Sequence, residues 1–240
     1  MSLRDFDMQI SDRNMTIHNI SQIGSIMRNA IVFDFKNSRE KMLSAEFIPA
    51  QVEQLIDLLE TRKISYALVN GIALLTYVEG RNTQDIHLIM ALPSLSKIPE
   101  INVENQDMYF ARGKFGELQI DILLTKNPLF AKVEKDYTTT KQFMDRKIRC
   151  ATVDGLILLK LFALPSLYRE ACPEPGRRGS FERVGIYEND IATLIHAFNP
   201  KIETLLTELS KHLNETDMVE ARQIMADIES RIQRFRKSNK

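Results

Sequence analysis

Apolar residues recur at helical spacing in one early segment and in four segments after residue 152. In residues 48–64, Val52, Leu55, Ile56 and Leu59 fall on one side of a predicted helix. The four later helices are predicted at 153–164, 187–198, 201–213 and 216–235. The first of these four is apolar on nearly every side, which indicates a buried helix.

Between these helices the pattern indicates strands. We predict a buried strand ended by glycine, then a short helix closed by Gly80, then a second strand stopped by Pro93. A hairpin with its turn near Gly113–Gly116 leads into a third strand, a helix follows it, and a segment with partial strand alternation comes next. In chain order these segments are 65–71, 72–80, 83–92, 108–125 with its third strand at 118–124, 128–136 and 141–152.

The order of these elements predicts an α+β fold, in which a small mixed β-sheet core is followed by a C-terminal helical domain. We place the mixed domain at 46–152 and the helical domain at 153–240. Residues 1–45 are weakly patterned, apart from a stretch at 30–35 that is compatible with an edge strand. We expect them to form an N-terminal extension.

Composition narrows the classes of partner. Hydrophobic residues make up 44% of the chain, and 32 basic residues balance 32 acidic ones, so phosphate recognition would need a local cluster of charge. The longest apolar stretch, 156–165, is too short for a membrane span and contains a lysine, so we expect no membrane partner. The N-terminus lacks an apolar signal region. Together with only two cysteines, Cys150 and Cys172, this predicts free thiols and a cytoplasmic protein.

Two of the predicted strands carry polar side chains that can meet. Residues i and i+2 of a strand point to the same face, so Asp85 and His87 project together while Ile86 points into the core. Asp121 lies between two isoleucines of the third strand, and therefore on the face opposite to them. If the two strands are neighbours, these three side chains converge on one patch.

This pattern resembles the nucleotidyltransferase superfamily that includes polymerase beta, and within it the abortive-infection (AbiEii-like) branch. In that branch a strand ends in a small-residue turn, a helix follows, an Arg-x-Thr-x-Asp-x-Asp strand comes next, and a third aspartate lies on a later strand. The matching residues here are Asn70, Gly71, Arg81, Thr83, Asp85, His87 and Asp121. Lys160 and Asp190 match a later lysine and aspartate, so the resemblance covers about residues 50–200.

The resemblance implies transfer of a nucleoside monophosphate from a nucleoside triphosphate to a hydroxyl of RNA, a protein or a small molecule. It implies Mg²⁺ or Mn²⁺ as cofactor, held by Asp85, His87 and Asp121 as catalytic and metal-binding residues. It also implies nucleotide contacts from Asn70, Gly71, Arg81, Thr83 and Lys160. The branch is associated with toxin–antitoxin phage defence, which implies an antitoxin protein as a partner.

Two departures from the family pattern leave other functions open. His87 stands where the family has a second acid, and imidazole suits Mn²⁺ or Zn²⁺ better than Mg²⁺. Asn70 replaces the first small residue of the turn, where its side chain either hydrogen-bonds phosphate or crowds it. One alternative is therefore a catalytically degenerate relative that keeps the fold and nucleotide affinity. Another is an interaction module that binds a partner protein through its helical half.

Each candidate residue also has a structural interpretation. Asp85 and Arg81 can cap neighbouring elements, and His87 can be a hydrogen-bonded polar group without a metal. A buried ammonium needs an anionic partner, and for Lys160 we favour a structural pair with Asp190 over the metal site. A loop rich in proline, glycine and arginine is predicted at 171–185, and it is either a phosphate or RNA clamp or a solvated connector; its arginines are Arg177, Arg178 and Arg183.

Overall fold

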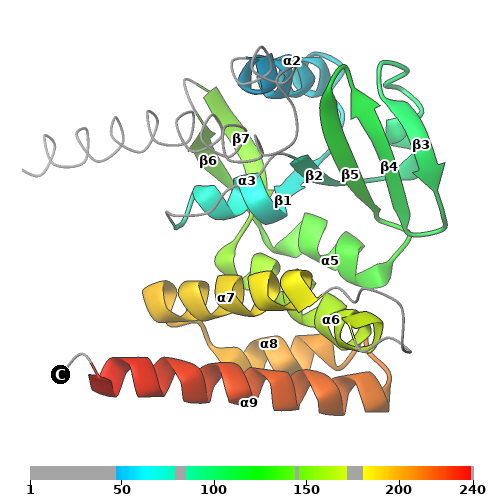
Figure 1. Cartoon of the computed structure of the whole chain (residues 1–240). Coiled ribbons are helices and arrows are strands. Elements are labelled where there is room, and N and C mark those ends of the chain that lie inside the picture. Colours follow the sequence, from blue (N-terminus) through cyan, green and yellow to red (C-terminus); the bar gives the residue numbers. More distant parts are fainter. Residues whose placement is uncertain (1–46, 79–84, 144–145, 172–180, 239–240) are drawn as a thin grey trace, which may run out of the picture. The chain divides into compact units, whose positions relative to one another are not determined.

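The computed structural model describes residues 47–78, 85–143, 146–171 and 181–238 (Figure 1). Contacts divide these residues into two compact units. The first contains the described residues up to Lys126 together with Thr139–Cys150, and the second contains Asn127–Thr138 and the described residues from Ala151 onward. The predicted extension at 1–45 lies outside the described residues.

A seven-stranded mixed sheet dominates the first unit, in the order β3-β4-β5-β2-β1-β7-β6. Its strands are β1 (Ala67–Val69), β2 (Asp85–Met90), β3 (Asn102–Gln106), β4 (Phe110–Phe115), β5 (Leu118–Leu124), β6 (Thr138–Phe143) and β7 (Arg146–Ala151). Strand β2 pairs antiparallel with β1 and parallel with β5, and β1 pairs parallel with β7. The predicted α+β class with a mixed sheet and C-terminal helices is therefore confirmed.

The register of the central strands forms one row of side chains. Val69 pairs with His87, His87 with Asp121, and Asp121 with Arg112 of β4. Directly opposed residues point to the same face, so this row crosses four strands on one side of the sheet. Along β2 and β5 the residues next to His87 and Asp121 are buried, as the strand alternation predicts.

The described helices of the first unit are α2 (Phe47–Thr61), α3 (Asn70–Leu75) and α4 (Leu92–Leu95). The predicted apolar side of α2 is buried, because Val52, Leu55, Ile56 and Leu59 are at most 1% exposed. Helix α3 follows β1 without a loop, and all six of its residues are buried. The prediction of a helix at 72–80 was wrong about its bounds, because the helix begins at Asn70 and ends at Leu75. Gly80 lies outside the described residues.

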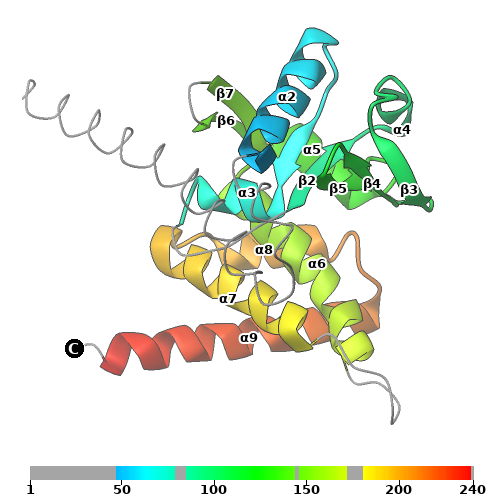
Figure 2. The ribbon, with the colours of Figure 1, turned by 45° about the horizontal axis from the view of Figure 1, so that its top comes forward.

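The second unit is helical. Its helices are α5 (Pro128–Asp136), α6 (Val153–Ala171), α7 (Phe181–Phe198), α8 (Ile202–Leu209) and α9 (Glu215–Ser238). Helix α6 contacts each of the other four, which explains why it is apolar on nearly every side. In Figure 2 it lies beside α7. Asn127 caps α5 by accepting a hydrogen bond from the Leu129 amide at 2.9 Å. Among the described helices, none combines the length and apolar composition needed to cross a bilayer.

Candidate functional site

Strands β2 and β5 bring Asp85, His87 and Asp121 together. One potential ligand atom from each side chain lies within 4.8 Å of the other two. His87 Nε2 is 3.4 Å from Asp121 Oδ2 and 3.8 Å from Asp85 Oδ2. The parallel pairing of β2 and β5 produces this convergence, because it places His87 directly opposite Asp121. The predicted meeting of the three side chains is confirmed, whereas their chemical roles stay predictions.

Arg112 is a fourth member of this cluster that the sequence analysis did not identify. It lies on β4 opposite Asp121. Its Nε donates to Asp121 Oδ1 at 2.6 Å, and its Nη2 donates to Asp121 Oδ2 at 2.7 Å. This parallel pair of hydrogen bonds is the geometry in which a guanidinium binds a carboxylate most strongly. Asp121 is therefore held from both sides, by Arg112 on β4 and by His87 on β2.

The predicted hairpin contained enough information to find Arg112. Phe115 pairs with Leu118, so only Gly116 and Glu117 connect β4 to β5. Gly116 has a φ of +60°, the left-handed conformation that glycine adopts readily in such tight turns. Counting back from a two-residue turn at this position places Arg112 opposite Asp121. The predicted turn was placed only near Gly113–Gly116, and this range does not define which residue of the first strand lies opposite Asp121.

The cluster keeps Asp121 ionised. Burial by itself would raise the pKa of the Asp121 carboxyl, but hydrogen bonds from His87 and Arg112 outweigh it and hold that pKa well below its usual range. The same hydrogen bond raises the pKa of the Arg112 guanidinium, with further contributions from the charges of Asp85 and Glu104. The charge of one guanidinium thus partly balances those of three carboxylates, Asp121, Asp85 and Glu104.

The donor set fits one divalent cation better than two. Asp85 and Asp121 supply hard carboxylate oxygens of the kind that Mg²⁺ and Mn²⁺ prefer. A third carboxylate at position 87 would be needed to match the family's ligand set for two ions, and the imidazole does not supply it. The group therefore offers two carboxylates and a borderline nitrogen, a set whose chemistry suits one ion better than two.

His87 is oriented as a hydrogen-bond donor. Its Nε2 faces both carboxylates, which favours a proton on that nitrogen. Its Nδ1 is buried and has no hydrogen-bond partner among the described residues. Binding a metal through Nε2 would move the proton of the neutral ring to Nδ1, where the described side chains offer no acceptor. The arrangement therefore favours His87 as a donor to Asp121 over His87 as a metal ligand.

The other predicted nucleotide contacts are distributed along the chain. Asn70 and Gly71 are buried at the start of α3, directly after Val69, which pairs with His87. Asn70 has a φ of +55°, a left-handed conformation that asparagine tolerates better than most residues. Arg81 and Thr83 lie outside the described residues. Contact of any of these residues with a nucleotide stays a prediction.

Lys160 belongs to the second unit, where it is fully buried in α6. Its Nζ donates to Asp190 Oδ2 at 2.7 Å and lies 4.3 Å from the centre of the Tyr187 ring. The predicted Lys160–Asp190 pair is confirmed, and its burial is typical of a structural ion pair. The arginines at 177 and 178 lie outside the described residues, while Arg183 lies in the first turns of α7.

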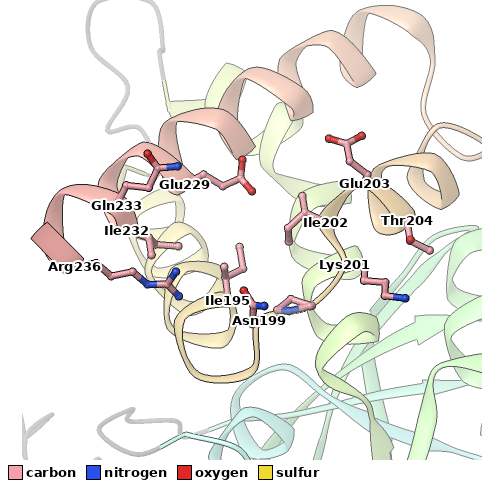
Figure 3. Close-up of a pocket in the computed structure, with 11 residues that line it drawn as sticks. Ile195, Asn199, Lys201, Ile202, Glu203, Thr204, Glu229, Ile232, Gln233 and Arg236 are labelled. Carbon is pink, nitrogen blue, oxygen red and sulfur yellow. The ribbon is translucent and has the colours of Figure 1, made fainter.

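A surface pocket of about 500 Å³ lies between α7, α8 and α9 (Figure 3). Lys201 and Arg236 line it together with Glu203 and Glu229, so two cations are balanced by two anions. None of the predicted site residues contributes to it. A polyphosphate needs a surplus of positive charge, which this lining does not provide.

Comparisons with known proteins give structural similarities at low sequence identity. No family model matches the chain, and no curated protein matches it. A crystal structure of an antigenic nucleotidyltransferase-like protein from Paracoccidioides brasiliensis is 15% identical, with a TM-score of 0.45, over 74% of this chain and 92% of that chain.

Two structures of the antibiotic-resistance factor ANT(2″)-Ia are also similar. The crystal structure in complex with adenylyl-2″-tobramycin is 13% identical, with a TM-score of 0.43, over 72% of this chain and 96% of that chain. The solution structure is 14% identical, with a TM-score of 0.41, over 68% of this chain and 97% of that chain. Similarities at this level do not transfer the activity of those proteins to this chain.

Proposed function

We propose that this protein is a nucleotidyltransferase. It would bind a nucleoside triphosphate with Mg²⁺ or Mn²⁺ and transfer the nucleoside monophosphate to a hydroxyl group. One observation carries the proposal: Asp85 and Asp121 meet across two adjacent parallel strands, in a group whose ligand atoms lie within 4.8 Å of one another. Paired carboxylates at neighbouring strands are the ligands that a hard divalent cation requires.

Each residue of the cluster has a proposed role. Asp85 and Asp121 would hold the cation, which when bound neutralises charge on the phosphate oxygens. Arg112 orients the Asp121 carboxylate by two hydrogen bonds, and His87 contacts it from the other side at 3.4 Å. Asn70 and Gly71, next to His87 through the register of β1, are proposed to contact the triphosphate. Arg81, Thr83 and Lys160 remain proposed auxiliary residues on the basis of the family resemblance.

The proposed reaction is a group transfer at phosphorus. The acceptor hydroxyl oxygen forms a bond to the α-phosphorus, and the bond between that phosphorus and the bridging oxygen of the β-phosphate breaks. Pyrophosphate leaves, and the proton of the hydroxyl passes to solvent or to a carboxylate of the site. Hydroxyl groups of RNA, proteins and small molecules can all take part in this reaction. The chemistry therefore does not select the acceptor, and the experiment has to compare the three classes.

The test is incubation of the full chain with α-labelled nucleoside triphosphates, Mg²⁺ or Mn²⁺, and separate acceptor pools of RNA, protein and small hydroxyl compounds. We expect label to enter one pool with the wild type and to be lost in Asp85→Ala. Glu117→Gln, which removes an exposed acid in the hairpin turn, is the matched control and should keep the activity. Equal labelling by the wild type and Asp85→Ala would contradict the proposal.

A catalytically degenerate nucleotidyltransferase is the second candidate, and the contacts of Asp121 favour it. Arg112 occupies both carboxylate oxygens, and His87 stands where the family has an acid. In this case the protein keeps nucleotide affinity without transfer. His87→Asp separates the two candidates: transfer that appears in His87→Asp but not in the wild type supports the degenerate protein. Nucleotide-dependent thermal stabilisation that is lost in Asp85→Ala excludes a pure interaction module.

The family resemblance also supports a proposal about biological context. In the abortive-infection branch the protein would act in the cytoplasm as the toxin of a toxin–antitoxin pair, with an antitoxin protein as partner. The test is co-expression with the product of the adjacent gene. Growth arrest that requires Asp85 and is relieved by the neighbour supports this role. Growth arrest that persists in Asp85→Ala separates toxicity from the proposed transfer.

A further inference from the structure

We propose that Arg112 sets the cation affinity of the site, because it occupies the Asp121 carboxylate as an internal counter-cation that a divalent metal must displace. This inference rests on the proposed cation site of Asp85 and Asp121. It assigns Arg112 as a positioning residue that acts through Asp121. The consequence is a site that binds its metal more weakly than its two carboxylates alone would.

The hydrogen bonds of Arg112 carry the first step. Nε and Nη2 use both Asp121 oxygens at once, at 2.6 and 2.7 Å. A cation that binds either oxygen in the same plane competes with these N–H groups, and the guanidinium charge repels it at close range. Metal binding and the two-bonded Arg112 contact therefore oppose each other.

The exposure of Arg112 makes displacement feasible. Its side chain is 47% exposed, whereas the Asp121 side chain is 20% exposed. A guanidinium that leaves Asp121 can thus be solvated by water without opening the core. The backbone of Asp121 stays fixed by its pairing with both β4 and β2, so the carboxylate keeps its place when Arg112 moves. Arg112 is the movable partner and Asp121 the fixed one.

Strand β4 offers a matched control. Lys114 lies two residues beyond Arg112 and therefore on the same face of the sheet. Its side chain is 48% exposed, and its Nζ lies 3.2 Å from Glu104 Oε1 instead of contacting Asp121. Removing the Lys114 charge changes the net charge of the protein by the same amount as removing the Arg112 charge, without freeing Asp121. The two variants separate a direct contact from a general electrostatic effect.

The experiment measures Mn²⁺ binding to the full chain without nucleotide, by titration calorimetry and by the electron paramagnetic resonance signal of free Mn²⁺. We expect Arg112→Gln to bind Mn²⁺ about fivefold more tightly than the wild type, the value of an exposed ion pair. Lys114→Gln should change the affinity less than about twofold, by weak screened interaction alone. The increase in Mn²⁺ affinity caused by Arg112→Gln should vanish when Asp121 is also replaced, so Arg112→Gln/Asp121→Asn should bind no more tightly than Asp121→Asn alone.

Arg112→Lys provides a second variant that keeps the charge but loses the parallel hydrogen bonds, and it should bind Mn²⁺ with an intermediate affinity. Circular dichroism and thermal unfolding show whether each variant is folded. If the wild type is silent and Arg112→Gln binds, Arg112 masks the site completely and the inference is supported.

Three results overturn the inference. Equal or weaker binding by Arg112→Gln, with clear binding by the wild type, refutes the role of Arg112 and leaves the proposed cation site intact. Equal gains in Arg112→Gln and Lys114→Gln reduce the effect to net charge. If neither the wild type nor any Arg112 variant binds, the cation site itself fails, and the proposed function fails with it.

Discussion

Two cation–carboxylate pairs of nearly equal length lie in different surroundings in this protein. Arg112 donates to Asp121 at 2.6 and 2.7 Å on the sheet, and its side chain is 47% exposed. Lys160 donates to Asp190 at 2.7 Å inside the helical unit, where the two side chains are 0% and 7% exposed. Solvent can replace a partner in the first pair but not in the second. Burial, not distance, therefore separates a pair that a ligand can open from a pair that holds the fold together.

The largest expected effect comes from breaking the buried pair. Asp190→Ala removes the carboxylate that hydrogen-bonds a fully buried ammonium, so we expect a loss of about 3–5 kcal/mol in the free energy of unfolding. Urea unfolding followed by circular dichroism measures it. Lys160→Met/Asp190→Leu removes both charges and should be more stable than Asp190→Ala. A cost below about 1 kcal/mol for Asp190→Ala would show that the ammonium does not depend on this carboxylate.

Packing near Lys160 provides the next prediction. A Cβ added at Gly155 of α6 would lie 2.9 Å from the Tyr137 carbonyl oxygen, so Gly155→Ala should cost about 1–3 kcal/mol of stability. The matched control is Gly185→Ala in α7, where nothing lies within 4 Å of the added atom. Alanine is the better helix former, so this change should stabilise by about 0.5–1 kcal/mol. A neutral or stabilising effect of Gly155→Ala would mean that α6 is less tightly enclosed than its burial indicates.

The exposed pair should contribute little to stability. Arg112→Gln is expected to lower the free energy of unfolding by at most about 1 kcal/mol, because Arg112 is an exposed partner and the Asp121 carboxylate keeps its contact with His87 when Arg112 is removed. The same urea experiment measures it beside Asp190→Ala. Equal costs for the two variants would remove the distinction between the pairs.

A third pair, in which an exposed lysine contacts a largely buried carboxylate, gives the smallest effect and a pH dependence. Glu208 accepts a hydrogen bond from Lys211 Nζ at 2.7 Å, and this contact lowers the pKa of the Glu208 carboxyl despite partial burial. A lowered folded-state pKa means stability that is present above the unfolded-state pKa of 4.5 and is lost as the pH falls through the folded-state value. The stability difference between the wild type and Glu208→Gln should therefore be complete at about pH 6 and shrink below about pH 4.5. A difference that is constant between these values would contradict the lowered pKa.

Periodic elements were predictable because their signal is local. The helix α2 and the strands β2 and β5 appear where their apolar spacing placed them, and α6 begins at the predicted residue but continues seven residues beyond the predicted end at 164. Strand β3 was missed because all five of its residues are exposed, so it has no alternation and exists only through pairing with β4.

The site was predictable only where it depends on local structure. The alternation of side chains along a strand placed Asp85 and His87 on the same face, and placed Asp121 on the face opposite to its isoleucine neighbours. The contact between Arg112 and Asp121 depends on the register between β4 and β5. A turn shifted by one residue would pair Asp121 with a different residue of β4, so the sequence alone did not identify Arg112. The partner of Lys160 was foreseeable, because a lysine within an apolar helix requires an anion.

Local covalent geometry therefore determined which side chains share a face, since the direction of each Cβ follows from backbone period alone. Tertiary structure decided which strands are neighbours: that β5 lies parallel beside β2, and that β4 brings a guanidinium to the far side of Asp121. Those neighbours are chosen by hydrogen bonds and packing between segments distant in sequence. For this reason the carboxylates Asp85 and Asp121 could be identified from the sequence, while the Arg112 guanidinium that binds Asp121 could be identified only from the folded sheet.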